Sequence, residues 1–391
     1  MSDFYERSII IHEHLRGKIG IVSKMPIESQ DDLAIAYTPG VAGPCEKIAA
    51  DPALARELTI KRNAVAVVSD GSAVLGLGNI GPLAALPVME GKAMLFKEFA
   101  NIDAWPICLD TQDADEIVET VRRIAPTFGG INLEDISAPR CFEIEQRLQD
   151  LDIPVFHDDQ HGTAIVLLAA LINSCRILGR DPADLRVVVS GAGAAGTAIA
   201  QLLRCVNFDP NLCVPVRDIV VCDSRGAIHK DRDGLSAEKE MLLSFTNREQ
   251  HTGTVHEALE GADVFIGVSK GGLLNGEDVR RMAADPIILA MANPEPEIMP
   301  DLAREAGAAI VGTGRSDFAN QVNNVLAFPG IFRGALDAGA SNIDGAMKLA
   351  AAHALADAVA KPTRDMILPS PMDRSVAPLV AEAVRKAVNP S

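Results

Sequence analysis

The chain has 391 residues, of which 48% are hydrophobic and 23% are charged, a balance typical of a folded protein with two or three domains. Its formal net charge is −17 and it has no lysine- or arginine-rich run, which excludes binding to the phosphate backbone of nucleic acids. The longest apolar stretch, AIVLLAALINSC from Ala164, is too short to span a bilayer, so we expect no membrane partner.

After a helical start, the first part of the chain contains several short apolar runs that are typical of buried strands. These runs lie at 61–71, 104–110, 128–136 and 153–159. The apolar spacing over 113–125 predicts a helix. A strand, a helix and a strand in this order form a βαβ unit with parallel pairing. We therefore expect an N-terminal α/β catalytic domain at residues 1–160.

From about residue 163 the pattern becomes regular, with a helix followed by five strand-like runs and helical segments between them. The strands are expected at 185–191, 218–224, 262–269, 287–294 and 308–314. Two more helices, within 342–360 and 377–388, follow the last strand. This order predicts a doubly wound, Rossmann-type NAD(P)-binding domain with C-terminal helices at residues 161–391.

The cysteines number seven, and none forms a Cys-X-X-Cys pair. They are Cys45, Cys108, Cys141, Cys175, Cys205, Cys213 and Cys222. Their odd number and their places in apolar runs predict reduced thiols, without a disulfide framework or a zinc site. The first residues, MSDFYERSII, contain both acidic and basic side chains and do not look like a signal peptide. We therefore expect a cytoplasmic protein.

Two segments match G-x-G-x-x-G, the pattern of a phosphate-binding turn: GLGNIG at 76–81 and GAGAAG at 191–196. GAGAAG follows an unbroken β run and opens an alanine-rich helix, which is the context of a dinucleotide-binding turn. The residues expected to contact the cofactor there are Gly191, Gly193, Ala194, Ala195 and Gly196.

Asp223 ends the next apolar strand, where a carboxylate can bind the ribose hydroxyls of the adenosine. This charge favours NAD, because it repels the 2′-phosphate of NADP. Arg225, two residues further on, can pair with that same phosphate. The residues thus lean toward NAD, and both NAD and NADP stay open.

GLGNIG has a less typical context. It is followed at once by Pro82, which can open a helix, but no acidic residue ends a following strand at the right distance. The motif alone therefore favours a structural turn. The segment beyond it, PVMEGKAMLFKEF, carries Lys92 between apolar residues.

Carboxylates end two of the predicted strands: Glu134 and Asp135 in INLED, and Asp158 and Asp159 in PVFHDD. Ligands of open parallel sheets bind beyond the carboxyl ends of the strands, so both pairs are expected at one site. Clustered carboxylates repel one another unless a hard cation such as Mg²⁺ or Mn²⁺ neutralises them. Alternatively, each pair only caps a helix. The two pairs together favour a metal site.

The second acidic pair is flanked by His157 and His161, and histidines four residues apart can bind zinc. The stretch DDQHGTA more readily starts a helix in which one histidine makes a polar contact.

Lys92 and Tyr37 are the candidates for proton transfer. A lysine near a cation and shielded from water has a lowered pKa and can act as a base, and a phenol can donate a proton. A solvated lysine and a packed turn tyrosine are the ordinary alternatives, and the residue types alone favour them.

Eight stretches, in this order, resemble the short bacterial type of malic enzyme over residues from about 10 to 385: AYTPGVA, VLGLGNIGP, EGKAMLFKEF, INLEDI, VFHDDQHGTA, GAGAAG, MANPEPEI and QVNNVLAFPGIFRGAL. The resemblance implies oxidative decarboxylation of L-malate to pyruvate and CO₂, with NAD or NADP and with Mg²⁺ or Mn²⁺. It also implies a cytoplasmic homo-oligomer, either a homodimer or a dimer of dimers.

The resemblance also assigns roles to residues. Tyr37 matches the general acid, and Lys92 matches the general base. The implied metal ligands are Glu134, Asp135 and Asp159. The residues expected near the substrate and the nicotinamide are Asn293, Asn324, Gly76 and Gly78. The resemblance thus implies that GLGNIG lines the active site.

Ala73 stands where the larger eukaryotic malic enzymes have an arginine for a malate carboxylate, so the group that binds the distal carboxylate is open. Two other functions are alternatives to malate decarboxylation. One is a metal-dependent 2-hydroxy-acid dehydrogenase that does not decarboxylate, and the other is a non-catalytic nucleotide sensor.

Overall fold

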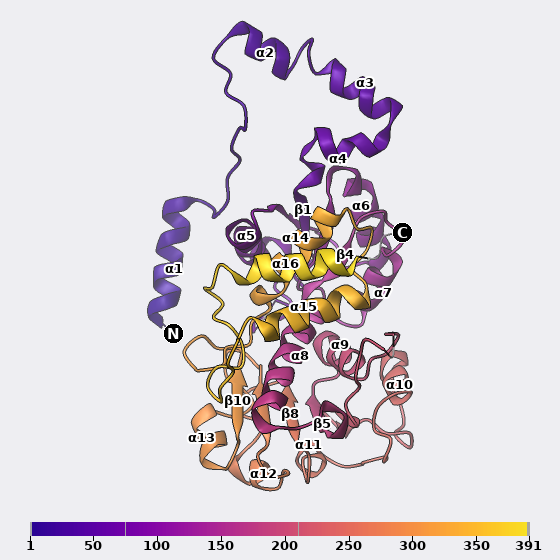
Figure 1. Ribbon diagram of the computed structural model, residues 1–391, viewed down its shortest axis with the longest axis vertical. Coiled ribbons are helices and arrows are strands. Elements are labelled where there is room, and N and C mark those ends of the chain that lie inside the picture. The colour runs from indigo at the N-terminus through magenta and orange to yellow at the C-terminus, as the bar shows by residue number, and fades with distance from the viewer. Residues whose placement is uncertain (1, 75, 210, 389–391) are drawn as a thin grey trace.

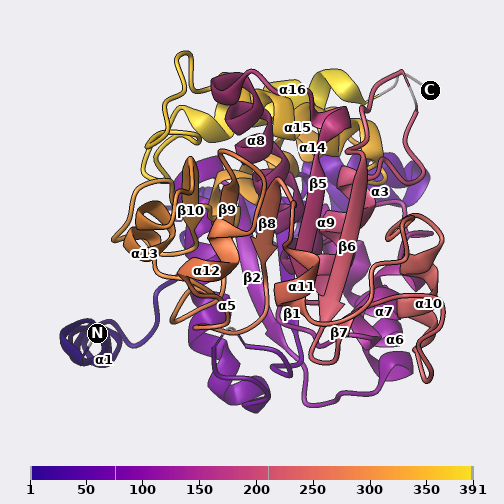
Figure 2. The same cartoon turned by 90° about the horizontal axis from the view of Figure 1, so that it is seen from below.

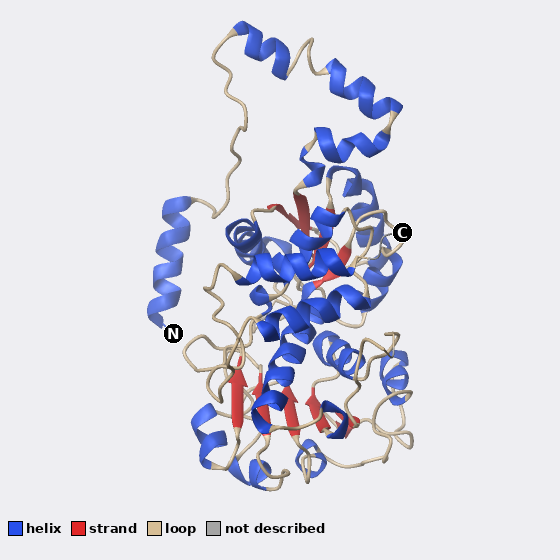
Figure 3. Ribbon diagram, viewed as in Figure 1, coloured by secondary structure: helices blue, strands red, loops and turns tan. Residues whose placement is uncertain are grey.

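The computed structural model describes residues 2–74, 76–209 and 211–388, and within them the chain forms two β-sheets covered by helices (Figures 1 and 3). The first sheet has the order β2-β1-β3-β4, and all of its neighbouring strands are parallel. Its strands are β1 (Ala64–Ser69), β2 (Asp103–Cys108), β3 (Gly130–Leu133) and β4 (Val155–His157). The expected βαβ unit is confirmed.

The helices of this first half are α5 (Gly81–Ala100), α6 (Ala114–Ile124) and α7 (Arg140–Arg147). Pro82 lies in the first turn of α5, as expected for a proline that opens a helix. Asp113 caps α6 by accepting a hydrogen bond from the backbone N–H of Glu116. The apolar stripe of α6 is buried against the sheet, which explains why the period of 3.6 residues was visible in the sequence.

The second sheet has the order β10-β9-β8-β5-β6-β7, and only the short β7 is antiparallel to its neighbour (Figure 2). Its strands are β5 (Arg186–Ser190), β6 (Asp218–Asp223), β7 (Gly226–Ala227), β8 (Val264–Gly267), β9 (Ile287–Ala290) and β10 (Ile310–Thr313). Three of the five parallel strands, β8, β9 and β10, are buried along their whole length, and β5 and β6 each expose only one end residue in part, as their unbroken apolar runs predict. The doubly wound domain is confirmed.

Helix α8 (Asp158–Leu178) joins the two sheets and packs along α9 (Ala194–Leu203). By length and composition α8 could cross a membrane, although 61% of its most apolar window is buried inside the protein. It is the central core helix of the chain (Figure 1).

The C-terminal helices return to the first sheet. They are α14 (Phe328–Ala338), α15 (Gly345–Asp357) and α16 (Val376–Ala387). Phe332 of α14 packs edge-on against Phe96 of α5 and Phe156 of β4, with ring centroids 5.3 and 5.8 Å apart. Gly330 lets α16 approach α14 closely, because a Cβ atom there would lie 2.6 Å from the Cβ of Val380.

The other helices are short. They are α10 (Ala237–Leu243), α11 (Val255–Ala258), α12 (Gly276–Arg280) and α13 (Pro300–Glu305), with 3₁₀ turns at Pro52–Leu54, Ile60–Arg62, Ala125–Thr127, Pro182–Asp184 and Asn324–Leu326.

The N-terminal region differs from the rest of the chain, because none of residues 4–63 is buried. It contains α1 (Ser2–Leu15), α2 (Gln30–Ala36), α3 (Ala42–Ala50) and α4 (Ala55–Leu58). Figure 1 shows α2 and α3 as an outlying loop at the top of the molecule, and α1 beside the body.

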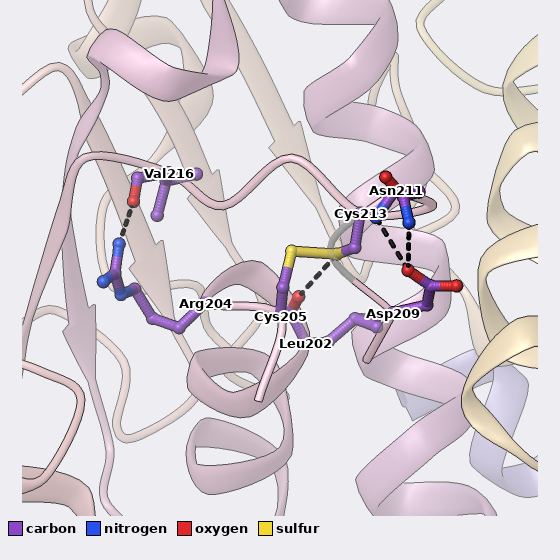
Figure 4. Close-up of a disulfide and its surroundings, with 7 residues drawn as sticks. All are labelled: Leu202, Arg204, Cys205, Asp209, Asn211, Cys213 and Val216. Atoms are coloured by element: carbon purple, nitrogen blue, oxygen red, sulfur yellow. Dashed lines mark hydrogen bonds between the residues drawn. A yellow bond between two sulfur atoms is a disulfide. The ribbon is translucent and has the colours of Figure 1, made fainter. Parts of the chain in front are cut away.

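One expectation about the cysteines is wrong. Cys205 and Cys213 form a disulfide, because the loop after α9 brings their Cα atoms to 5.8 Å (Figure 4). The other five cysteines are free thiols. The spacing of the cysteines in the sequence did not predict this pairing. The disulfide depends on the conformation of one local loop and is not part of a set of several disulfides.

Asn173 connects α8 to the C-terminal part of the chain by hydrogen bonds. Its buried Nδ2 donates hydrogen bonds to the carbonyl oxygens of Ala356 (2.9 Å) and Ile367 (2.8 Å). We expect Asn173→Ala to lower the free energy of unfolding by about 2–4 kcal/mol, because two buried carbonyls lose their donor. Urea unfolding measures this, and the exposed Asn342→Ala is the control. Equal midpoints for the two variants would contradict the assignment.

Candidate active site

Lys92 is the only lysine on the buried face of α5, where it shares an apolar stripe with Met89 and Phe96. Its Nζ lies 2.8 Å from Oε1 of Glu134 and 2.6 Å from Oδ2 of Asp158. The same ammonium group lies 4.1 Å from the centre of the Phe328 ring, a cation–π distance. The fold therefore holds a buried lysine in one place, against two carboxylates and an aromatic ring.

Three carboxylates next to this lysine form a cluster. Glu134 and Asp135 follow β3, and Asp159 lies in the first turn of α8. One ligand oxygen from each lies within 4.8 Å of the others. Asn132 donates a 2.8 Å hydrogen bond to Glu134, and the backbone N–H of Asp135 donates one of 2.8 Å to Asp159. Asp158 and Asp159 lie in the first turn of α8 but do not cap it, since His157 is the N-cap residue and no side chain caps the helix.

Burial and mutual repulsion disfavour the charged forms of these acids. Burial is the largest cause, followed by neighbouring carboxylates, and together they raise the pKa of Asp135 to about 9. Burial likewise raises the pKa of Asp158 to about 7 and that of Asp159 to about 6, in spite of Lys92. The pKa of Glu134 is also raised by burial.

The pKa of Lys92 differs from the expectation. Burial alone would lower the pKa of this ammonium group, but Asp158, Glu134 and Asp159 together outweigh burial and raise it. The prediction of a lowered pKa assumed a bound cation, and the protein groups alone shift the pKa in the other direction. It neglected that the acids expected to bind a cation also surround the lysine.

The cluster fits a hard divalent cation. Oδ2 of Asp135 and Oδ1 of Asp158 are buried, and neither has a hydrogen-bond partner among the described residues. Carboxylate oxygens at this spacing are the donor set that Mg²⁺ and Mn²⁺ prefer. A cation here would satisfy the free oxygens and remove the repulsion.

The zinc alternative has no support among the described residues, since the group of possible metal ligands contains carboxylates only. His161 instead lies 2.9 Å from Oε1 of Glu145, and its other ring nitrogen lies 3.2 Å from Nζ of Lys348. The expected polar contact of one histidine is confirmed.

GAGAAG forms the turn between β5 and α9 and lines a cavity of about 750 Å³. Gly191 has φ of +120°, and a Cβ atom on Gly196 would lie 1.8 Å from the carbonyl oxygen of Gly191. Side chains at these two positions would therefore disrupt the turn. A Cβ at Gly193 would meet nothing within 4 Å, so this position leaves room for a ligand at the N-terminus of α9. Ala194 and Ala195 form the first turn of that helix.

Asp223 lines the same cavity but is not a free carboxylate. Arg232 donates hydrogen bonds of 2.5 Å to both of its oxygens, and Lys239 donates one of 2.6 Å. Burial opposes ionisation, but these donors lower the pKa of Asp223 to about 2. The side chain of Arg225 reaches the carbonyl oxygens of Asp233 and Gly234 at 3.4 and 3.5 Å.

The two asparagines, Asn293 and Asn324, contact different parts of the first half of the chain. Asn324 donates a 2.5 Å hydrogen bond to Asp158, the same oxygen that pairs with Lys92. Asn293 follows β9, and a Cβ atom on Gly76 would lie 3.7 Å from its backbone oxygen. Gly76 and Gly78 both have positive φ, 74° and 76°. The loop of GLGNIG therefore lies close to the segment that follows β9.

Tyr37 is placed apart from these residues. It ends α2 in the outlying N-terminal loop, and 68% of it is exposed. Within one chain, the structure brings together Lys92, Glu134, Asp135 and Asp159. Tyr37 ends α2, and this helix lies apart from the body of the molecule in Figure 1.

Three functional residues were not assigned roles from the sequence. Asp158 was noted only as half of an acidic pair, although its place at the end of an apolar run is the signal for its burial. Arg232 and Lys239 lie 9 and 16 residues after the acid they neutralise, in a region without a motif.

Comparison with known proteins agrees with this geometry. Residues 16–149 match the malic enzyme N-terminal domain, and residues 160–389 match the malic enzyme NAD binding domain. The chain is 55% identical over 386 residues to the bifunctional malic/malolactic enzyme of Bacillus subtilis (strain 168), which covers 98% of this chain and 92% of that protein. It is 49% identical over 390 residues to an NADP-dependent malic enzyme of Rhizobium meliloti (strain 1021), covering 95% and 50%. The crystal structure of an NAD-dependent malic enzyme from Thermotoga maritima superposes with a TM-score of 0.92 at 46% identity, covering 96% of this chain and 98% of that one.

The acidic cluster generates a prediction about cation binding. We expect Asp135→Ala to weaken Mn²⁺ binding at least tenfold, because a carboxylate ligand is lost. Titration calorimetry with Mn²⁺ measures this without turnover. Asp110→Ala is the matched control, since Asp110 also follows a strand of the same sheet, β2, but is exposed. Equal Mn²⁺ affinity in both variants would rule out Asp135 as a ligand.

Proposed function

This chain belongs to the malic enzyme family, and we propose on that premise that it catalyses the oxidative decarboxylation of L-malate to pyruvate and CO₂ with reduction of NAD or NADP. The observation that carries the proposal is the buried ammonium group of Lys92, which lies 2.8 Å from one acid of the three-carboxylate cluster. A non-catalytic nucleotide sensor would need neither group.

Glu134, Asp135 and Asp159 are proposed to hold Mg²⁺ or Mn²⁺. When bound, the cation makes the C2 hydroxyl of malate more acidic and stabilises negative charge on its oxygen. The turn at Gly191–Gly196 is proposed to hold the dinucleotide, which accepts the hydride from C2, and Asp223 and Arg225 line the same cavity.

Lys92 is proposed to take the proton from the C2 hydroxyl. Its pKa is raised here by the surrounding carboxylates, so neutralising those carboxylates removes the cause and lets the lysine work as a base. Asp158 and Asn324 act as positioning residues, because both lie on one hydrogen-bonded chain with the lysine Nζ.

Decarboxylation at C4 leaves the enolate of pyruvate, which needs a proton at C3. Tyr37 is proposed to donate it. Asn293, Asn324, Gly76 and Gly78 are proposed to line the substrate and nicotinamide region, since Gly76 and Asn293 lie side by side across the two halves of the chain. We also propose the division into a catalytic unit at 1–160 and a cofactor unit at 161–391, and a cytoplasmic homodimer or dimer of dimers.

The reaction is tested by supplying L-malate, Mn²⁺ and either cofactor, and measuring reduced cofactor, pyruvate and CO₂. Equal amounts of the three products are expected. Reduced cofactor with oxaloacetate but no CO₂ would instead support a 2-hydroxy-acid dehydrogenase, and no malate-dependent reduction would contradict an enzyme of either kind.

Lys92→Ala is expected to lower kcat at least a thousandfold while the Kd for the reduced cofactor stays unchanged, because the base is lost and the glycine turn is not. Stopped-flow kinetics and cofactor fluorescence measure the two quantities. Lys97→Ala, on the exposed side of the same helix, is the control. A normal kcat for Lys92→Ala would remove this residue from the base role.

The neutralised Asp223 has a consequence for cofactor choice. Two cations pair with one carboxylate, so this end of the cavity does not repel a 2′-phosphate as a lone aspartate would. We expect Lys239→Ala to raise the KM for NADP about tenfold more than the KM for NAD, the effect of one charged hydrogen bond. Steady-state kinetics with both cofactors measures this, with the exposed Lys230→Ala as control. An equal change for both cofactors would contradict it.

A further inference from the structure

Glu297 is a buried carboxylate to which the proposed function gives no role. It is the last acidic residue of the stretch MANPEPEI, and its exposed fraction is 0%. Glu295, two residues earlier in the same stretch, is exposed. A glutamate is almost never fully buried unless other groups satisfy its oxygens. The groups that bind Glu297 therefore indicate its role.

Two backbone N–H groups from different loops bind this carboxylate. Its Oε1 accepts a hydrogen bond from the N–H of Ser269, and its Oε2 accepts one from the N–H of Ala292, both at 3.0 Å. Ser269 lies in residues 268–275, here called the β8 loop, and Ala292 lies in residues 291–299, here called the β9 loop. Strands β8 and β9 are parallel neighbours in the second sheet (Figure 2). The carboxylate thus connects the two loops at the carboxyl ends of these strands.

The end of β8 leaves space for this carboxylate. Gly267 is the last residue of β8, and a Cβ atom there would lie 2.3 Å from Cδ of Glu297. The backbone makes a further connection, because the N–H of Leu274 donates a 2.9 Å hydrogen bond to the carbonyl oxygen of Glu297. Burial raises the pKa of Glu297, and the N–H groups of Ser269 and Ala292 oppose this rise by stabilising the charged form.

The β8 loop borders the proposed cofactor site. Ser269 lines the same cavity of about 750 Å³ as the glycine turn, and its Oγ lies 2.9 Å from Oγ of Ser190 at the end of β5. A Cβ atom on Gly191 would lie 2.7 Å from the carbonyl oxygen of Val268, so the loop lies directly against the turn. A shift of the β8 loop would therefore change the cavity where the turn is proposed to hold the dinucleotide.

We propose that Glu297 is a positioning residue of the cofactor site, whose carboxylate holds the β8 loop and the β9 loop in one arrangement. It acts through Ser269 in the β8 loop and through Asn293, which directly follows Ala292 in the β9 loop. The role requires a carboxylate, because each loop needs an acceptor oxygen. A carboxamide offers one such oxygen and an NH₂ group that only donates. This inference rests on the proposed function for the role of Asn293.

Glu297→Gln tests the inference, because it keeps the shape of the side chain and removes one acceptor. We expect the Kd for the reduced cofactor to rise about tenfold and kcat to fall about tenfold, the effect of one charged hydrogen bond. The Kd for Mn²⁺ is expected to stay unchanged, since the described hydrogen bonds of the acidic cluster involve neither loop. Cofactor fluorescence, steady-state kinetics and calorimetry measure the three quantities, with NADH or NADPH as probe, whichever the wild type binds more tightly.

A change in the Kd for the cofactor alone supports the inference and identifies the β8 loop as the one released. A change in kcat alone also supports it and identifies the β9 loop. Glu295→Gln is the matched control, because this exposed acid lies in the same loop, and it is expected to keep wild-type values. Unchanged Kd and kcat in Glu297→Gln would overturn the inference, even if urea unfolds this variant more easily, because the role would then be structural only.

Gly267→Ala provides a second route to the same contact. It keeps the carboxylate, but its Cβ atom occupies the place of that group, so we expect the same changes in Kd and kcat. The double variant Gly267→Ala/Glu297→Gln is expected to be no worse than either single variant, because both disturb one contact. Changes that multiply in the double variant would show two independent effects and contradict the inference.

The proposed function fails separately from this inference. A wild-type chain that binds the reduced cofactor but shows no malate-dependent reduction overturns the function. The Kd for the cofactor then tests the positioning role alone, and an equal Kd in the wild type and Glu297→Gln overturns that role too. A wild type that binds neither NADH nor NADPH overturns both.

Discussion

Inside the first half of the chain, one ammonium group faces four carboxylates that are largely shielded from water. Lys92 pairs directly with Glu134 and Asp158, while Asp135 and Asp159 are left with a single backbone hydrogen bond between them. In such surroundings an unpaired charge costs several kcal/mol, so the acids hold their protons more tightly than in water. This imbalance connects the separate properties of the site: the raised pKa values, the free oxygens and the fit to a divalent cation.

The fold brings the charged groups of this site together from distant segments of the chain. The lysine comes from the inner face of α5, two acids follow β3, two begin α8, and the 3₁₀ turn before α14 supplies Asn324. Parallel strands make this convergence possible, because their carboxyl ends meet at one edge. Phe328 lies against Lys92 and Phe332 packs against Phe156, so the C-terminal helix α14 contacts the first sheet although it follows the Rossmann strands in sequence.

Much of this arrangement could be predicted from the sequence, where the signal was local. The valine-rich strands, the glycine turn and the acids that end apolar runs are each read from adjacent residues. Contacts between residues distant in the sequence could not be predicted from such local signals. Arg232 and Lys239 neutralise the charge of Asp223, and three carboxylates raise the pKa of Lys92, which was expected to be lowered. Both effects depend on charge partners that only the folded chain brings together. The disulfide depends on a loop conformation, and the place of Tyr37 depends on where a whole segment is anchored.

The position of Asp158 and Asp159 in the first turn of α8 has a further effect on the acids. The aligned peptide dipoles of an α-helix place about half a positive charge at its N-terminus, and burial reduces the screening of that charge by water. The acids of this turn thus lie in a favourable field that the backbone supplies permanently. Together with Lys92, this field partly compensates the carboxylates before any cation arrives. The acids of this turn therefore depend less on a cation for their stability than their number alone suggests.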